Sequence, residues 1–213
     1  MEEAEVEHVL VDPFNVKNAD AFKYIAMDSG AYRAFKKEVA LPAIPAGNWE
    51  FVVSPDVIGD PQASWSAWMA EKSKMPVWHW GDPMKLLRWY LQEAKGVIGI
   101  GGCEDKMRER SGPLWHGLYK ICQMHPGRFH VFGANWLELL SRISPYIVSA
   151  DTSKWLDGAR YGEIIDTDLK PFKSELSRQD RCVTYARVMN EVFNADHLKK
   201  KNFFQSFLQF DSE

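Results

Sequence analysis

The sequence is poor in cysteine and has no long hydrophobic run. Its 213 residues include three cysteines, Cys103, Cys122 and Cys182, which are odd in number and far apart. This spacing is typical of neither a disulfide framework nor a CxxC zinc site, so we expect reduced thiols, no metal and no cofactor. No stretch approaches the roughly 18 apolar residues of a membrane helix. The acidic start MEEAEVEHVL also lacks the basic region of a signal peptide. We therefore expect a cytoplasmic protein without a membrane partner.

The sequence also lacks an excess of positive charge. It has 26 Lys and Arg against 29 Asp and Glu, a formal net charge of −3. That balance argues against a protein that mainly grips phosphates without specificity, although a local basic face can exist on an acidic chain. The candidates for such a face are Lys199 to Lys201 and the group Lys106, Arg108 and Arg110. A solvated run of lysines is the simpler interpretation of the first group.

Short apolar runs recur along the chain and predict strands. They lie at residues 8–13, 24–28, 51–56, 76–81, 96–102, 128–133, 146–151 and 163–168. Most are continuous, as expected for parallel strands that are buried on both faces. Helical spacing fills 61–74, 82–95, 111–125 and 135–143 between them. This alternation indicates an α/β fold, and eight strands favour a compact or irregular (β/α)8 barrel over an open sheet.

The hydrophobic fraction of 46% is enough for one core, so we expect a single catalytic domain over residues 1–213. Residues 175–213 are expected to be a C-terminal helical extension. In it, 177–193 and 197–210 have the spacing of two amphipathic helices that could cover the wall or the end of the barrel.

Polar residues and glycines follow the predicted strands at the points where they end. They are Asp28-Ser29-Gly30, Asp56, His79, Gly101-Gly102 and Asp151. In a barrel these strand ends converge on one mouth, which holds the active site. Taken singly, each aspartate is well explained as a helix cap and each glycine as a turn. Taken together, they predict a site with several carboxyl groups.

The same segments resemble a known enzyme superfamily. The order DSGAY at 28–32, SPD at 54–56, HWG at 79–81, GIGGC at 99–103, FHVFGAN at 129–135 and SADTSKW at 149–155 resembles the tRNA-guanine transglycosylases. Within that superfamily it is most similar to the phage and bacterial enzymes that insert 7-deazaguanines into DNA. The resemblance spans about residues 24–160 and implies a bacterial or phage-infected host cell.

The resemblance implies roles for individual residues. Asp151 matches the nucleophile that attacks C1′ of the target nucleoside and holds the sugar as an ester. Asp28 matches an aspartate of proton transfer, with Ser29 and Gly30 beside it as substrate contacts. Asp56 falls where the family reads the edge of the base.

Two further matches concern the surroundings of the base, and Arg160 is a candidate from the sequence alone. Gly101 and Gly102 match a glycine pair whose backbone lies against it. His79 or Gly81 stands where the family usually has Gln-Gly. Arg160 could pair with a phosphate or with an aspartate, and a surface salt bridge is an equal alternative.

The chemistry of base exchange needs these residue types. Double displacement at a sugar uses a carboxylate nucleophile and a second acid/base group. Guanine presents two N–H donors on one edge, which a carboxylate at Asp56 could accept together. An aromatic lining of Trp78, Trp80, Trp155 or Tyr32 could hold the extruded base, and a core role is at least as good for each. His130 is either an inward-facing substrate contact or a satisfied core histidine.

The sequence departs from the tRNA enzymes in one respect. Those enzymes carry a structural zinc held by three cysteines and a histidine beyond the nucleophile, whereas only Cys182 follows Asp151 here. We therefore expect DNA rather than tRNA as the polymer and a free 7-deazaguanine-type base as the second substrate. A homo-oligomer is compatible with a protein of this size that acts on a polymer. Two alternatives stay open: a non-catalytic barrel that binds nucleic acid or a protein, and a hydrolase of small glycosides or nucleosides that uses the same carboxylates.

Overall fold

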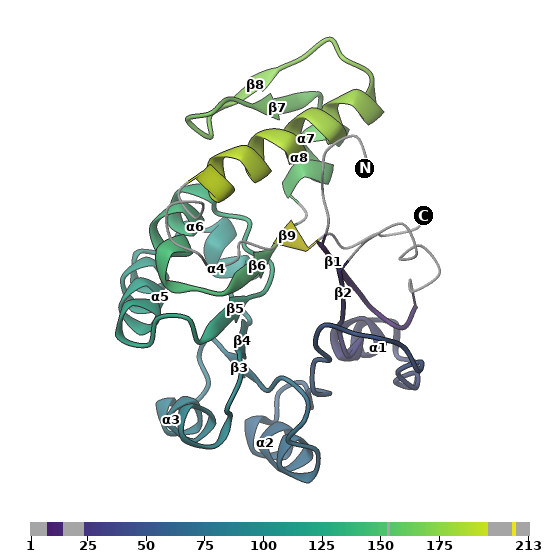
Figure 1. The fold of residues 1–213 in the computed structure, drawn as a ribbon, viewed down its shortest axis with the longest axis vertical. Helices are drawn as coiled ribbons and strands as arrows, with labels where there is room; N and C mark the ends of the chain where they lie inside the picture. The colour runs from purple at the N-terminus through teal and green to yellow at the C-terminus, as the bar shows by residue number, and fades with distance from the viewer. Residues whose placement is uncertain (1–7, 15–23, 153, 196–205, 208–213) are drawn as a thin grey trace.

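Parallel strands lie at the centre of the molecule, with helices outside them (Figure 1). A computed structural model describes residues 8–14, 24–152, 154–195 and 206–207. Five parallel strands are adjacent in the order β3 (Val77–His79), β4 (Ile98–Gly101), β5 (Phe129–Val131), β6 (Ser149–Asp151) and β9 (Ser206–Phe207). A second parallel pair consists of β1 (His8–Val11) and β2 (Tyr24–Met27). The predicted mixed α/β class with parallel strands is confirmed.

The segment 51–53 joins the two groups of strands through backbone hydrogen bonds. On one side, Met27 N–H donates to the Phe51 carbonyl at 2.9 Å, and Val53 N–H donates to the Met27 carbonyl at 2.8 Å. On the other side, Met75 N–H, just before β3, donates to the Val52 carbonyl at 2.7 Å. The predicted strand at 51–56 is therefore reduced to isolated parallel bridges that continue the array from β2 to β3.

The four predicted helices are confirmed. They are α2 (Pro61–Ala70), α3 (Met84–Glu93), α5 (Gly112–Met124) and α6 (Leu137–Ile143). The starts of α2 and α5 follow from local chemistry, because the side chains of Asp60 and Ser111 cap these two helices, each with a proline in the first turn. Three shorter elements accompany them: α1 (Ala31–Lys37), α4 (Glu104–Arg108) and the 3-10 turn η3 (Ser144–Tyr146).

The strands separate two kinds of buried side chain. The outward-facing residues Trp78, Ile100 and Val131 pack with the helices in the main core. Inward-facing residues form smaller clusters around Val53, Val77 and Phe132. Because side chains alternate along a strand, the inward face continues into the polar residues at the strand ends. The fold therefore aims those residues at a common interior.

The prediction for the last strand of the barrel, at 163–168, is wrong about which strand it pairs with and in which direction. This segment is β7 (Glu163–Ile165), which pairs antiparallel with β8 (Pro171–Lys173) in a separate hairpin. The place beside β6 is held by β9. The turn explains the hairpin: Leu169 has a positive φ of 64°, and the Asp166 carboxylate accepts N–H bonds from Asp168 and Lys170, both at 2.9 Å.

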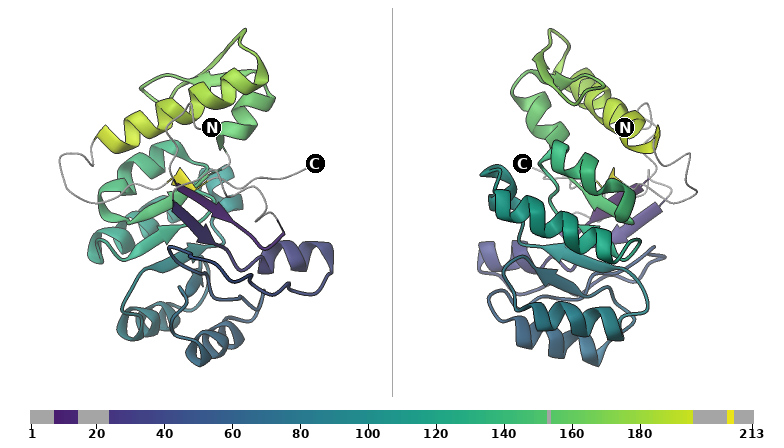
Figure 2. Two further views of the ribbon diagram at one scale, coloured as in Figure 1. Left: turned by 45° about the vertical axis from the view of Figure 1, so that its right-hand side comes forward. Right: turned by 90° about the vertical axis from the view of Figure 1, so that its left-hand side faces the viewer.

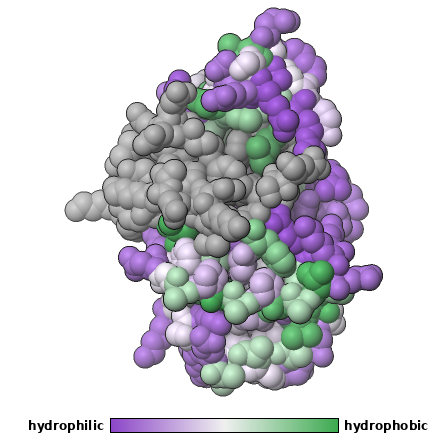
Figure 3. Space-filling model, turned by 90° about the vertical axis from the view of Figure 1, so that its right-hand side faces the viewer, coloured by the Kyte–Doolittle hydropathy of each residue, from purple (hydrophilic) through white to green (hydrophobic). Residues whose placement is uncertain are grey.

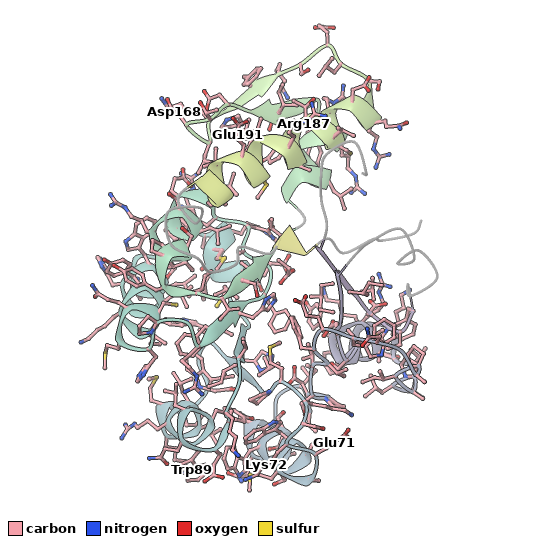
Figure 4. The ribbon with its side chains drawn as sticks, viewed as in Figure 1. Glu71, Lys72, Trp89, Asp168, Arg187 and Glu191 are labelled. Carbon is pink, nitrogen blue, oxygen red and sulfur yellow. The ribbon has the colours of Figure 1, made fainter. Side chains whose placement is uncertain are left out.

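The C-terminal part of the chain covers one end of the molecule. The first predicted helix is confirmed as α8 (Arg178–Ala195), which lies against α7 (Lys154–Arg160) and β7 (Figure 2). Figure 4 shows Asp168 of the hairpin and Arg187 and Glu191 of α8 at this end. Most of the second predicted helix, 197–210, lies outside the described residues; at 206–207 the prediction is wrong, because these residues form β9. Among the described helices, none has the length and apolarity to cross a membrane.

Candidate active site

A cavity of about 430 Å³ opens at the carboxyl ends of the parallel strands, and we call it the carboxyl-end cavity. Its size is within the range of small-molecule sites. Seven of the predicted site residues line it, namely Asp28, Ser29, Asp56, His79, Gly101, Gly102 and Asp151. They come from the ends of β2, β3, β4 and β6 and from the loop after residue 53. The structure thus brings both proposed catalytic carboxyl groups to one cavity.

Three predicted site residues are not brought to this cavity. Gly30 begins α1 with a φ of 72°, and a Cβ there would lie 3.1 Å from Cδ of Pro13, so turn geometry explains this glycine. Gly81 also has a positive φ, of 104°. Arg160 is exposed at the end of α7. None of the three lines the carboxyl-end cavity, so their role as substrate contacts stays a prediction.

Asp151 is held through one of its two carboxylate oxygens. Its side chain is 10% exposed, and Oδ1 accepts the backbone N–H of Gly133 at 3.0 Å. The Nε2 atom of His130 lies 3.4 Å from the same oxygen. Within the part of the chain that the structure describes, Oδ2 has no hydrogen-bond donor. The carboxylate is therefore fixed in orientation while Oδ2 stays available to a substrate.

His130 supports Asp151 from inside the strand array. It is fully buried, and its Nδ1 lies 2.8 Å from Oγ of Ser149, its direct register partner on β6. The rings of Phe51 and Phe132 pack around it, with centroid distances of 5.7 and 4.5 Å. His130 faces inward as expected, yet it is not among the residues that line the cavity. The core interpretation therefore describes it better than the substrate-contact interpretation.

Asp28 has the protonation behaviour of an acid/base group. Burial raises the pKa of its carboxyl group to about 7, with smaller contributions from the negative charges of Asp151 and Asp12. The backbone N–H of Ser29, which donates to Asp28 Oδ1 at 2.7 Å, opposes this shift. A carboxyl group with a pKa near neutrality can both give and take a proton at neutral pH.

Asp56 belongs to a second group of titratable side chains in the cavity. Burial raises its pKa to about 8, and the charges of Asp28 and Asp82 add to the effect. Its Oδ2 lies 3.5 Å from Nε2 of His79, whose own pKa is lowered by burial, with Asp82 opposing. At neutral pH the Asp56 carboxyl group is therefore mostly protonated. A base that binds through two N–H donors would therefore bind the ionised form of this group and displace its proton.

His79 is fixed by Asp82, a residue that the sequence reasoning missed. Oδ2 of Asp82 accepts the His79 backbone N–H at 3.1 Å and lies 3.8 Å from Nδ1 of the ring. Gly101 makes room for the ring, because a Cβ at this position would lie 2.7 Å from Cδ2 of His79. Packing against His79 therefore explains the glycine pair independently of any contact with a base. The spacing of Asp82, three residues after His79, was a signal in the sequence.

Asp12 is a second residue that was missed. It follows β1 as Asp28 follows β2, is 2% exposed, and lies 3.2 Å from the guanidinium of Arg33. The backbone N–H of Phe14 also donates to it, at 2.9 Å. The strand-end pattern that selected Asp28 applies equally to Asp12. Its paired charge favours a structural role behind Asp28.

Of the four candidate aromatic residues, the structure places Tyr32 at the cavity. Its side chain is half exposed, and Nζ of Lys36 lies 4.7 Å from the ring centroid. Figure 3 shows the face that carries α1, where hydrophobic residues gather among hydrophilic ones below the grey atoms. Trp78 is buried in the main core, Trp80 packs against it, and the side chain of Trp155 lies outside the described part.

The predicted basic group on α4 is neutralised by neighbouring acids. Lys106 pairs with Glu109 at 2.8 Å, and Arg108 pairs with Glu104 at 3.0 Å. Arg110 lies 3.6 Å from Glu138. Lys199 to Lys201 lie outside the described residues. Over the described ranges there is also no cluster of three or more His, Cys, Asp or Glu side chains that could hold a metal ion.

No protein-family model matches the chain, and no curated protein matches its sequence.

Proposed function

We propose that the protein is a transglycosylase that exchanges guanine for a 7-deazaguanine base in a nucleic acid, with DNA favoured over tRNA. One observation carries the proposal: Asp28 and Asp151 line the same cavity, and the charge of Asp151 acts on Asp28. A retaining displacement at a sugar needs this combination of an acid/base group and a carboxylate nucleophile. Buried carboxyl groups of like charge are a cost to a purely structural domain, which favours the enzyme over the non-catalytic alternative.

In the first step, Oδ2 of Asp151 attacks C1′ of the target nucleotide. The Oδ2–C1′ bond forms as the glycosidic C1′–N9 bond breaks, and the electron pair of that bond leaves with the guanine. Asp28, protonated near neutral pH, gives its proton to the leaving base. The products are neutral guanine and an ester between Asp151 and the sugar, with Asp28 as the carboxylate.

In the second step, the Asp28 carboxylate takes the N9 proton of the incoming base. N9 attacks C1′, the Oδ2–C1′ bond breaks, and Asp151 is released as a carboxylate. Two inversions at C1′ give overall retention. Atoms, charge and protons balance over the cycle, with Asp28 returned to its protonated form.

Asp56 and His79 are proposed to read the base. A guanine-type edge with two N–H donors would bind the ionised form of Asp56, so its binding would release a proton from this group below about pH 8. His79, held by Asp82, presents Nε2 beside Asp56. The backbone of Gly102 also lines the cavity.

We also propose that the strands close into an irregular (β/α)8-type barrel. Backbone hydrogen bonds and parallel bridges connect β2, the segment 51–53 and β3 without a break. At the other edge, β9 pairs with β6 and lies against β1. Closure would explain why all the polar strand ends face one interior.

A base-exchange assay tests the proposal. The protein is incubated with duplex DNA, single-stranded DNA or tRNA and a labelled 7-deazaguanine base, in parallel with Asp151→Asn. We expect label in the DNA with the wild-type protein and none with Asp151→Asn. A hydrolase would instead leave abasic sites without label. If no polymer takes up label or loses guanine, the proposed function is wrong.

A further inference from the structure

We propose that His130 and Ser149 are positioning residues for Asp151, which select Oδ2 as the attacking oxygen and promote breakdown of the covalent intermediate. The inference rests on the proposed function, because it assigns a step of that reaction to two residues outside the cavity lining. Both residues lie within the segments 129–135 and 149–155 that carry the resemblance, but the resemblance assigns no role to either of them. The proposed role of each residue is supported by the contacts that it makes in the structure.

The contacts form a linear chain behind the carboxylate. Oγ of Ser149 lies 2.8 Å from Nδ1 of His130, and Nε2 of the same ring lies 3.4 Å from Oδ1 of Asp151. Ser149 is 1% exposed and His130 is fully buried. Buried polar groups of this kind need partners, so each member orients the next.

The contact with Ser149 selects one tautomer of the ring in this proposal: the Ser149 hydroxyl donates to Nδ1, which places the ring proton on Nε2. Nε2 is buried and lies 3.4 Å from Oδ1 of Asp151 without the alignment of a hydrogen bond in the free protein, so the bond to Oδ1 forms only when the ring and the carboxylate align during the reaction. The N–H of Gly133 donates to the same oxygen at 3.0 Å. The Gly133 N–H therefore holds Oδ1, with Nε2 of His130 3.4 Å from the same oxygen, while Oδ2 is left for C1′. Asp151 is presented with a defined face rather than as a freely rotating carboxylate.

This arrangement affects the two chemical steps unequally. In the first step the carboxylate loses negative charge, so donors on Oδ1 orient Asp151 without stabilising the product ester strongly. In the second step the Oδ2–C1′ bond breaks and the charge returns, shared over both oxygens. The Gly133 N–H, and the Nε2–H of His130 once it aligns with Oδ1, stabilise that charge as it develops. Removing the Nε2 donor should therefore slow release from the ester more than formation of the ester.

The test compares four substitutions with the wild-type protein. His130→Leu removes the donor, and His130→Gln keeps an N–H group. Ser149→Ala keeps the ring and removes only the group that holds it. Ser144→Ala is the matched control, since Ser144 is also a buried serine, and its hydroxyl donates to the Ser141 carbonyl away from the cavity.

The readouts are the rate of base exchange at saturating substrate and the fraction of protein present as covalent adduct in the steady state. We expect exchange to fall about tenfold in His130→Leu, the effect of one hydrogen bond to a charged group, and less in Ser149→Ala. The adduct fraction should rise in both, and His130→Gln should recover part of the exchange rate. Ser144→Ala should match the wild type in both readouts.

The outcomes separate this inference from the proposed function. If the wild-type protein neither exchanges bases nor forms an adduct, the proposed function fails and the inference with it. If the wild type is active but exchange and adduct fall in proportion in His130→Leu and Ser149→Ala, the two residues are merely structural and the inference fails alone. Should His130→Leu not fold, Ser149→Ala decides the matter by the same two readouts.

A spectroscopic measurement tests the geometry without activity. In protein labelled with ¹⁵N-histidine, the nitrogen shifts of His130 should indicate a proton on Nε2 and none on Nδ1. Ser149→Ala should change this pattern, and Ser144→Ala should not. A proton on Nδ1 in the wild type, with a bare Nε2 facing Asp151, would overturn the inference.

Discussion

The two ends of the parallel strands differ in the sign and the burial of the charged side chains that gather there. At the amino ends, a larger cavity of about 800 Å³ is lined by residues of both signs, and we call it the amino-end cavity. Lys72 and Glu93 pair there at 2.7 Å with side chains nearly half exposed, and Figure 4 shows Lys72 near the surface beside α2. At the carboxyl ends, Asp28, Asp56 and Asp151 share a smaller cavity, and burial raises the pKa of the first two.

This difference separates a solvated surface from a working site. Exposed ion pairs such as Lys72–Glu93 contribute about 0–1 kcal/mol to folding stability and are ordinary features of a protein surface. Carboxyl groups whose pKa is raised by burial and by neighbouring negative charges cost stability, and natural proteins keep such arrangements mainly where chemistry needs them. The carboxyl-end cavity is thus the place to look for activity. Substitutions at the carboxyl end should affect activity strongly, and substitutions at the amino end should affect it little.

The largest effect is expected at Asp151. Asp151→Asn keeps the shape of the side chain but removes the nucleophilic oxygen, so base exchange should fall at least about 1000-fold. The measurement is incorporation of labelled base into DNA. The matched control is Glu93→Gln in the amino-end cavity, which also neutralises one carboxylate. Equal losses in the two variants would remove the distinction between the ends.

Asp28 should show the next largest effect. Asp28→Asn removes the acid/base group, and we expect about 100-fold to 10,000-fold slower adduct formation. In the wild type, adduct formation needs the protonated form of a group with a pKa of about 7. The single-turnover rate should therefore fall about tenfold per pH unit well above pH 7. A rate that rises through this range would contradict the role of Asp28 as the acid.

Binding of the free base should be linked to Asp56. Because a guanine-type edge binds the ionised form of a carboxyl group whose pKa is about 8, binding at pH 7 should release close to one proton. Calorimetry of 7-deazaguanine binding in buffers of different ionisation enthalpy measures that number. Asp56→Asn should bind more weakly by about tenfold and release none. Proton uptake on binding would indicate that Asp56 does not read the base in this way.

Folding stability should respond to pH with a defined sign. The folded-state pKa values of Asp28 and Asp56, about 7 and 8, lie above the ordinary value of 3.8, so the folded state binds more protons in between. Their contribution to stability is fully present below about pH 4 and is lost as pH rises to about 8. At pH 8.5, Asp56→Asn should therefore raise the melting temperature by a few degrees.

The control for this prediction is again the amino end. Glu93→Gln should change the melting temperature by no more than about 2 °C at both pH 5 and pH 8.5, because it removes one exposed ion pair. A larger gain for Asp56→Asn at pH 5 than at pH 8.5 would reverse the expected sign.

Much of the site follows from strand-end reasoning. Asp28 and Asp151 each follow a short buried run, and alternation along a strand turns them to the same interior once the strands are parallel. That logic needs no knowledge of which strands are neighbours. It also selects Asp12, whose pairing with Arg33 the sequence does not show.

The remaining features depend on pairing and burial. The contact between His130 and Ser149 exists because these two residues are register partners on β5 and β6. Likewise, β9 rather than β7 lies beside β6, since β7 closes a local hairpin first. Protonation of Asp56 follows from its surroundings in space. None of these is encoded in a local pattern of residue types.

The most direct test of the central claim is to map the covalent intermediate. The wild-type protein is mixed with a guanine-containing DNA oligonucleotide in the absence of an incoming base, denatured, digested and analysed by mass spectrometry. A deoxyribose-linked adduct on the peptide that carries Asp151 is the predicted result, and Glu93→Gln should give the same adduct. An adduct on Asp28 or elsewhere, or guanine release without any adduct, would contradict the assignment of Asp151 as the nucleophile.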